Sequence, residues 1–421
     1  MIKTMTLAQG VTLRCFPADK FKQSCLSFQL VRPMAAEEVA QNALIPAVLL
    51  RGTTKHPDLR SITRKLDDLY GASVSALVRR IGDYQTTGLY CAFIADKFAL
   101  EGDAVLAPMV DFLRELLLEP AMDDGGFQRD FTESEKRNLI LTIESERNDK
   151  RSYANTQLLK AMCRADSFGI PRLGTVEQAS AIDHKSLFAH YQRILRESAV
   201  EIFYVGPADM HTVAALLQPI FAGIQRDYVN LPAQTPFHNG GSSHRTEEME
   251  VAQAKLCMGF TTPITNRDKE FAAMQVMNTV FGSGMTSKLF MNIREKMSLC
   301  YSIGSGYYGS KGILTVSAGI DADKEAVTRE EILHQLDACR AGEITPAELK
   351  SAKEAILSSL RGVHDSPGAI ENFHGTAAIS GLALTREGYM AAIEAVRPED
   401  VAAAARTVTL HSSYVLKGVT A

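Results

Sequence analysis

Ten histidines and seven cysteines are the side chains of this sequence with the strongest affinity for transition metals. A zinc site on a helix needs two histidines one turn apart, and the ten histidines include no HxxxH pair. The cysteines are odd in number, scattered, and without a CxxC pair, so they predict neither a cysteine-rich zinc site nor a disulfide framework. No local metal site is therefore predicted, and a ligand set assembled from distant loops is the alternative.

Two further patterns have simple structural explanations. The run Gly282-Ser283-Gly284 suggests a phosphate-binding loop, but it lacks both the Walker lysine–threonine pair and the GxGxxG spacing. His364 and His374 flank Asp365-Ser-Pro-Gly368, which is a helix-start signal, so capping explains these residue types without a functional pair.

Composition and charge exclude several classes of protein. The 421 residues are 46% hydrophobic and 22% charged, which is an ordinary globular composition. A net charge of −4 is too near neutral for the basic surface that nucleic acids require, so we expect no nucleic-acid partner. The purest apolar run, Ala43 to Leu50, is far shorter than a membrane span, and the N-terminus lacks an apolar stretch of signal-peptide length. We expect a cytoplasmic protein with reduced thiols and no membrane partner.

Hydrophobic periodicity predicts the elements that must position any functional side chain. Alternating runs predict strands at residues 10–17, 24–32, 73–80, 84–94, 199–205, 255–260, 301–308 and 312–320. Helical spacing predicts helices at residues 36–51, 97–118, 127–148, 183–196 and 268–281, and from 324 onward. Gly52 is expected to take the left-handed turn that ends the first helix.

The second half of the chain repeats the element order of the first. The tripeptide Ala95-Asp96-Lys97 recurs as Ala322-Asp323-Lys324, each time at the end of a strand pair. Residues 225–248 are rich in proline, glycine and serine, as linkers are. We therefore predict domains at residues 1–224 and 249–421 joined by a linker at 225–248. Strands interrupted by runs of helices favour an α+β fold, with mainly antiparallel sheets covered by helices.

Four segments carry a resemblance that spans nearly the whole chain. They are residues 181–206, the glycine turn and following motif at 281–302, the helix connection at 392–401, and the helix ending at Arg51-Gly52-Thr53. They resemble the pitrilysin/insulinase family of inverted-motif zinc peptidases, in its two-domain processing-peptidase branch. The resemblance implies two homologous α/β-sandwich domains of the LuxS/MPP-like metallohydrolase fold. It implies a degenerate zinc site in the N-terminal domain and an inactive-type C-terminal domain with an arginine/tyrosine motif.

The positions of the family's zinc site carry no ligands in this chain. The family's HxxEH motif supplies two imidazoles that grip Zn²⁺ and a glutamate that activates the bound water. Registered on Arg51-Gly52-Thr53, the three positions are Ala43, Pro46 and Ala47. Matching Glu135-Lys136 to the family's glutamate–lysine pair puts the third-ligand position at Thr142, and Glu144 lies nearby if the register slips. We therefore expect no metal, cofactor or catalytic residue here, and the proline should distort or restart the helix.

The arginine/tyrosine motif of the resemblance is present as Arg294 and Tyr301. In the family these side chains reach the substrate backbone at the scissile peptide. A guanidinium and a phenol are strong donors that hold a carbonyl and stabilise an oxyanion. The simpler interpretation is a solvated helix arginine and a half-buried strand tyrosine. The matching glycine turn and Leu299 spacing favour substrate binding.

This chain lacks the HxxEH motif but keeps the arginine/tyrosine motif. In this it resembles the zinc-free subunits of the paired members of the family, in which only one subunit carries zinc. We therefore predict a non-catalytic, substrate-binding subunit of a heterodimeric zinc metallopeptidase that acts on extended peptides. Its partner is then a homologous HxxEH subunit, which holds the zinc. Residues 148–154 look most like the inactive partner proteins associated with elongation factor P modification. A non-enzymatic scaffold of the same fold is the alternative, and an independent peptidase with an unrecognised site is a third.

Overall fold

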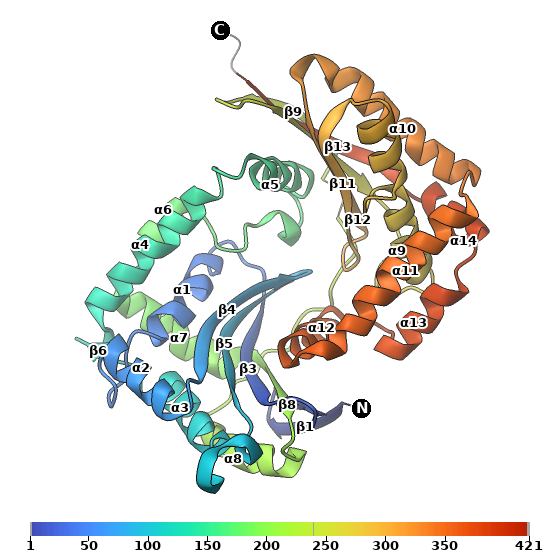
Figure 1. The fold of residues 1–421 in the computed structure, drawn as a ribbon. Coiled ribbons are helices and arrows are strands. Elements are labelled where there is room, and N and C mark those ends of the chain that lie inside the picture. The colour runs from blue at the N-terminus through green and yellow to red at the C-terminus, as the bar shows by residue number, and fades with distance from the viewer. Residues whose placement is uncertain (1, 239, 419–421) are drawn as a thin grey trace. The chain divides into compact units, whose positions relative to one another are not determined.

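The computed structural model describes residues 2–238 and 240–418. The chain forms two compact units, each built on one large sheet with helices packed against it (Figure 1). Unit 1 takes residues up to Glu144, residues 172–233 and residues 363–377, and unit 2 takes residues 145–171, 234–362 and those from 378 onward. This arrangement confirms the predicted α+β class. Within the described residues, no helix combines the length and apolarity needed to cross a bilayer.

Unit 1 is organised around a six-stranded sheet with the order β1-β2-β8-β3-β5-β4. Its pairs are antiparallel except for the parallel pair of β2 and β8. The strands are β1 (Lys3–Ala8), β2 (Val11–Pro17), β3 (Gln23–Pro33), β4 (Ser73–Ile81), β5 (Tyr84–Ile94) and β8 (Ala199–Gly206). A short ribbon of β6 (Met122–Asp123) and β7 (Gly126–Phe127) lies outside this sheet.

Strand alternation gives the unit 1 sheet two different faces. Leu26, Phe28 and Leu30 of β3 are buried in the main core. The helices that contribute to this core include α1 (Val39–Leu49), α2 (Leu59–Asp68), α3 (Leu106–Leu118), α4 (Arg129–Ser145), α6 (Val176–Ser180), α7 (His184–Glu197) and α8 (Met210–Ala222). The opposite face packs against α12 (Pro367–Ser380), whose Ile370 lies in a small cluster with Cys25.

Unit 2 repeats the plan with a five-stranded sheet of order β11-β12-β10-β13-β9. Only the pair of β13 and β9 is parallel. The strands are β9 (His244–Glu248), β10 (Ala254–Thr261), β11 (Cys300–Tyr308), β12 (Ile313–Ile320) and β13 (Thr409–Lys417). The strand β9 falls inside the segment that has linker composition.

The helices of unit 2 also divide between the two faces of its sheet. Helix α5 (Lys150–Met162) packs through Ala154 and Leu158 on Cys257 of β10. Because neighbouring residues of a strand point to opposite faces, the buried Leu256 and Met258 point away from α5. The remaining helices of the unit are α9 (Phe271–Phe281), α10 (Glu325–Ala341), α11 (Pro346–Gly362), α13 (Arg386–Ala395) and α14 (Pro398–Arg406).

The predicted strands are confirmed to within a few residues. The repeated tripeptides occupy matching places, because the 3₁₀ turns Asp96–Phe98 and Ala322–Lys324 follow β5 and β12. The division into residues 1–224 and 249–421 stays a prediction about the domains along the chain. The contact-based units follow a different division of the chain, since residues 145–171 pack in unit 2 and residues 363–377 pack in unit 1.

Candidate functional site

Helix α1 carries the three positions at which the resemblance places a zinc site. Ala43 and Pro46 are buried and Ala47 is half-buried, and none of these side chains has a lone pair to offer a metal. Asn42, one residue before Ala43, is the polar side chain that α1 buries in this region. The polar group that α1 buries beside these positions is therefore the amide of Asn42, which is not a zinc ligand.

Asn42 belongs to a chain of hydrogen bonds in the interior of unit 1. Its Nδ2 donates to Gln85 Oε1 at 2.9 Å, and its Oδ1 lies 2.7 Å from His190 Nε2. Arg193 Nη2 donates to His190 Nδ1 at 2.9 Å, so Nε2 carries the proton of the imidazole and donates it to Asn42. Burial lowers the pKa of His190 to about 4, which keeps the ring neutral at pH 7. His190 thus uses both nitrogens within the protein.

Pro46 does not restart the helix, and that expectation was wrong. Helix α1 continues through Pro46 to Leu49. Proline lacks the N–H that would bond to the carbonyl four residues earlier, which is that of Asn42. The hydroxyl of Thr87 on β5 donates to this carbonyl instead, at 2.5 Å. The neighbouring strand therefore satisfies the acceptor that the proline leaves open.

The helix end was also predicted wrongly. Gly52 does not take a left-handed backbone conformation. A Cβ at Gly52 would lie 2.8 Å from the carbonyl oxygen of Pro57 and 2.9 Å from the ring of Phe131, so close packing requires glycine here. Arg51 then pairs with Glu135 of α4 at 2.7 Å.

The third-ligand position also lacks a metal ligand. Thr142 is exposed on α4, and its hydroxyl donates to the carbonyl of Asn138 within the same helix. Across the described residues, no group of three or more histidine, cysteine, aspartate or glutamate side chains could hold a metal ion. The residues at the positions that the resemblance assigns to zinc therefore do not fit this metal.

Arg294 and Tyr301 lie in unit 2 on a stretch of irregular backbone. Arg294 is in the π-helix Leu289–Lys296, Ser298 has a positive φ of 50°, and β11 begins at Cys300. The pairing of β11 with β12 slips between Cys300 and Ser302, so Tyr301 is the extra residue of a β-bulge. π-Helices, positive φ at a residue other than glycine, and bulges all concentrate at functional sites.

Both side chains of the motif are presented to solvent. Tyr301 is 57% exposed, and its hydroxyl donates to Asp321 at 3.1 Å. Arg294 is 41% exposed and stacks on the ring of Phe290, with its guanidinium carbon 4.6 Å from the ring centre. Burial raises the pKa of the Cys300 thiol to about 11, and the charge of Arg294 counteracts this rise. The charge of Arg294 therefore reaches the residue beside Tyr301.

The glycine turn is held against β11 by specific contacts. The amide of Ser305 donates to the carbonyl of Gly282 at 3.0 Å, and the Ser305 hydroxyl donates to Asn278 Oδ1 at 2.7 Å. A Cβ at Gly282 would lie 2.6 Å from that hydroxyl and 2.7 Å from Leu289, so only glycine fits. The turn therefore has a packing role and holds the π-helix beside β11.

One buried charge was missed by the sequence analysis. Glu371 of α12 is fully buried and accepts two hydrogen bonds from Arg79 of β4, at 3.1 and 2.8 Å. Ser27 and Gln29 of β3 also donate to it, at 2.9 and 3.0 Å. The partners lie hundreds of residues apart, so no local pattern could have indicated them.

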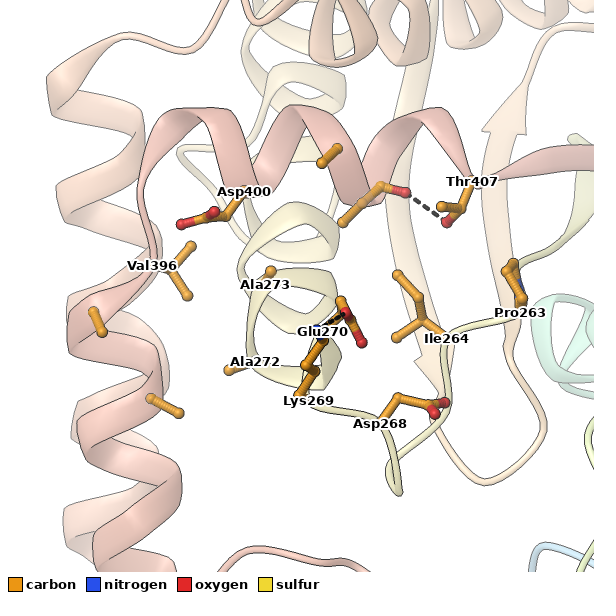
Figure 2. A pocket seen from close by; sticks show the side chains of 14 residues that line it. Pro263, Ile264, Asp268, Lys269, Glu270, Ala272, Ala273, Val396, Asp400 and Thr407 are labelled. Atoms are coloured by element: carbon orange, nitrogen blue, oxygen red, sulfur yellow. Dashed lines mark hydrogen bonds and ion pairs between the residues drawn. The ribbon is translucent and has the colours of Figure 1, made fainter.

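Figure 2 shows a hollow of about 760 Å³ in unit 2, bounded by α9, α13 and α14. Small apolar side chains such as Ala273 line most of it. Its carboxylates are already engaged, since Asp268 accepts from Thr265 and Asp400 pairs with Arg397. Its lining residues include no histidine and no cysteine.

Comparison with known proteins gives a consistent result. The Peptidase M16 inactive domain matches residues 181–356. "Probable inactive metalloprotease YmfF" of Bacillus subtilis is 29% identical over 409 residues, which cover 97% of this chain and 96% of that protein. The crystal structure of a conserved protein from Enterococcus faecalis V583 is 28% identical, with a TM-score of 0.92 over 100% of this chain and 99% of that chain.

A second crystal structure supports the fold alone. It is titled as a peptidase M16 inactive domain from Pseudomonas fluorescens, and it is 17% identical with a TM-score of 0.81. It covers 100% of this chain and 98% of that chain. These comparisons show that residues 181–356 are similar to the Peptidase M16 inactive domain, and that nearly the whole chain is similar to a probable inactive metalloprotease of Bacillus subtilis.

Proposed function

We propose that this chain is the non-catalytic, substrate-binding subunit of a heterodimeric zinc metallopeptidase that acts on extended peptides. The positions of the zinc site hold Ala43, Pro46 and Ala47, so metal and activated water must come from another polypeptide. The partner in this proposal is a homologue that carries HxxEH and the zinc. A cytoplasmic location is part of the proposal, and it is supported by the seven cysteines, which are all free thiols.

The observation that carries the proposal is the presentation of Arg294 and Tyr301. A purely structural tyrosine would gain stability by burying its ring, yet Tyr301 is 57% exposed at a bulge. The arginine that precedes it by seven positions is likewise solvent-accessible and lies in a π-helix. Two strong donors held on irregular backbone are suited to gripping a peptide carbonyl.

Strand β4 supports the preference for extended peptides. It lies at the edge of the unit 1 sheet and is paired only with β5 among the described residues. Arg172 donates to one carbonyl at this edge, that of Val78, at 3.0 Å. The rest of an edge strand can add an extended peptide through backbone hydrogen bonds.

The test is peptide hydrolysis by the reconstituted pair. This chain is mixed with an HxxEH homologue from the same cell, and cleavage of a fluorogenic extended peptide is measured for the wild type and for the Arg294→Ala/Tyr301→Phe double variant. We expect the double variant to lower kcat/KM by about tenfold or more, because it removes hydrogen bonds to a carbonyl that gains negative charge.

The control is Arg329→Ala, which removes a surface arginine of α10 that pairs with Glu325 in the same unit. Sedimentation of the pair should be the same for all variants. If kcat/KM of the double variant equals that of the wild type while the pair still assembles, the substrate-contact role is wrong. That result would favour the non-enzymatic scaffold.

A further inference from the structure

One face of the unit 2 sheet brings a lysine, a serine and a glycine side by side. In the pairing register, Lys255 of β10 lies opposite Gly319 of β12, and Gly319 lies opposite Ser302 of β11. Residues directly opposite one another in antiparallel strands point to the same face. The next row on this face is Cys257, Ser317 and Gly304, and Cys257 packs against α5.

Two cations reach over the glycines of this face. A Cβ at Gly319 would lie 3.3 Å from Lys255 Nζ and 3.0 Å from Ser302 Oγ. A Cβ at Gly304 would lie 3.6 Å from Nη2 of Arg151, which is on the first turn of α5. The ammonium, the guanidinium and the serine hydroxyl are therefore gathered above the same small part of the sheet.

These cations lack the carboxylate partners that would balance them. Lys255 Nζ donates to Gln253 Oε1 at 3.3 Å, which is a neutral acceptor. The guanidinium of Arg151 makes no hydrogen bond or ion pair within the described parts of the chain. Partial burial lowers the pKa of Lys255, and repulsion from Arg151 lowers it further.

Asp149 is the carboxylate within electrostatic reach of both cations, and its charge raises the pKa of Lys255 by less than Arg151 lowers it. Its oxygens are engaged as the cap of α5. Oδ1 accepts from the amides of Arg151 and Ser152, and Oδ2 accepts from the Ser152 hydroxyl. Asp149 therefore makes no direct ion pair with either cation.

The floor beneath the cations is open. Gly304 and Gly306 lie in the interior of β11, where glycine weakens a strand and commonly marks the close approach of a ligand or another backbone. A Cβ at Gly306 would meet only the hydroxyl of Thr315, at 3.7 Å. The Cβ positions of Gly304 and Gly306 therefore meet no side-chain atom closer than 3.6 Å, and the atom at that distance over Gly304 is Nη2 of Arg151.

We propose that Lys255, Arg151 and Ser302 form a binding site for a carboxylate of the peptide substrate. The assignment of the ligand as a peptide rests on the proposed function, whereas the anion preference rests on the cations themselves. Ser302 follows Tyr301 directly in β11, so the serine of this site lies one residue from the tyrosine to which the proposed function assigns the peptide. The substrate class is therefore an extended peptide with an acidic residue near the segment that Arg294 and Tyr301 hold.

The test measures peptide affinity of the isolated full-length chain by fluorescence anisotropy. Two labelled extended peptides differ only in a central glutamate or glutamine. We expect the glutamate peptide to bind about tenfold more tightly, as one hydrogen-bonded charge contact supplies. The preference should disappear in Lys255→Gln and Arg151→Gln, and Lys255→Glu should favour a lysine peptide instead. Lys350→Gln, a 76% exposed lysine of α11, is the control and should keep the preference.

The outcomes separate this inference from the proposed function. Equal affinity for the two peptides overturns the carboxylate site and leaves peptide binding standing. Loss of the preference in the Lys350→Gln control also overturns it, because general charge would then explain the effect. Absence of binding by any peptide contradicts the proposed function as well. Inorganic phosphate that binds through Lys255 and Arg151 when peptides do not would identify an anion site without a peptide ligand.

Discussion

Acid should destabilise unit 1 through a single buried imidazole. His190 is 6% exposed and donates and accepts within a closed network, so a proton on Nδ1 would break the hydrogen bond from Arg193. Burial is the largest cause of its lowered pKa, and the charges of Arg193 and Arg32 act in the same direction. Glu38 opposes them, since its carboxylate favours the protonated ring.

The magnitude follows from the two pKa values of this residue. The pKa is about 4 in the folded chain and 6.5 for an unperturbed histidine. Between these values the unfolded chain binds a proton that the folded chain does not, so the free energy of unfolding falls as the pH falls. At about 1.4 kcal/mol per pH unit, the loss is about 2 kcal/mol at pH 5 and about 3 kcal/mol at pH 4, below which it stops growing.

The assay is urea unfolding followed by circular dichroism, because the chain contains no tryptophan. Measurements at pH 7.5 and pH 5 are compared for the wild type and for His190→Gln, which keeps a donor and an acceptor but does not titrate. The variant should lose about 2 kcal/mol less than the wild type between the two pH values. His334→Gln, at a 69% exposed position, is the control and should behave as the wild type. Equal acid losses in the wild type and His190→Gln would refute the reasoning.

Two further predictions concern stability at neutral pH. Glu371→Ala should lower the free energy of unfolding by about 3–5 kcal/mol, because it leaves the half-buried Arg79 and the buried Ser27 and Gln29 without the fully buried carboxylate that they contact. Glu201→Ala breaks a pair in which both side chains are partly exposed, and it should lower the free energy of unfolding by at most about 1 kcal/mol. Equal losses in urea titrations would contradict the importance of the buried carboxylate. Thr87→Val should lower the free energy of unfolding by about 1–3 kcal/mol, because it leaves the Asn42 carbonyl without a hydrogen-bond donor. Adding Pro46→Ala to this variant should recover part of the lost free energy, because alanine restores a backbone N–H that can donate to that carbonyl. A double variant no more stable than Thr87→Val alone would show that the helix does not close over residue 46.

Much of the fold could be predicted because strand and helix periods are local properties of the sequence. The alternation of Leu26, Phe28 and Leu30 marks one face of β3, and the structure buries all three. The assignment of Ala43, Pro46 and Ala47 to zinc-site positions stays a prediction, which rests on the register given by Arg51-Gly52-Thr53. Their inability to hold metal follows from residue type alone.

The remainder depends on partners that are distant in sequence. Pro46 is tolerated inside α1 only because Thr87, on another element, supplies a hydroxyl to the open carbonyl. Glu371 and Arg79 are 292 positions apart, and nothing near either residue indicates an ion pair. Residues 363–377 also belong to unit 1 through partners that are distant in sequence, such as Cys25, which packs in one cluster with Ile370. Lys255 and Arg151 likewise could not be placed together from the sequence, because their proximity depends on the pairing register of the strands.

The described residues of helix α1 include no histidine and no other ligand of an HxxEH-type zinc site, and a zinc titration of the purified chain tests most directly whether the chain binds zinc. Calorimetry at pH 7.5 would compare the isolated chain with an HxxEH homologue measured under the same conditions. The account predicts stoichiometric binding of zinc by the homologue and none by this chain. One tightly bound zinc per molecule of this chain would contradict it.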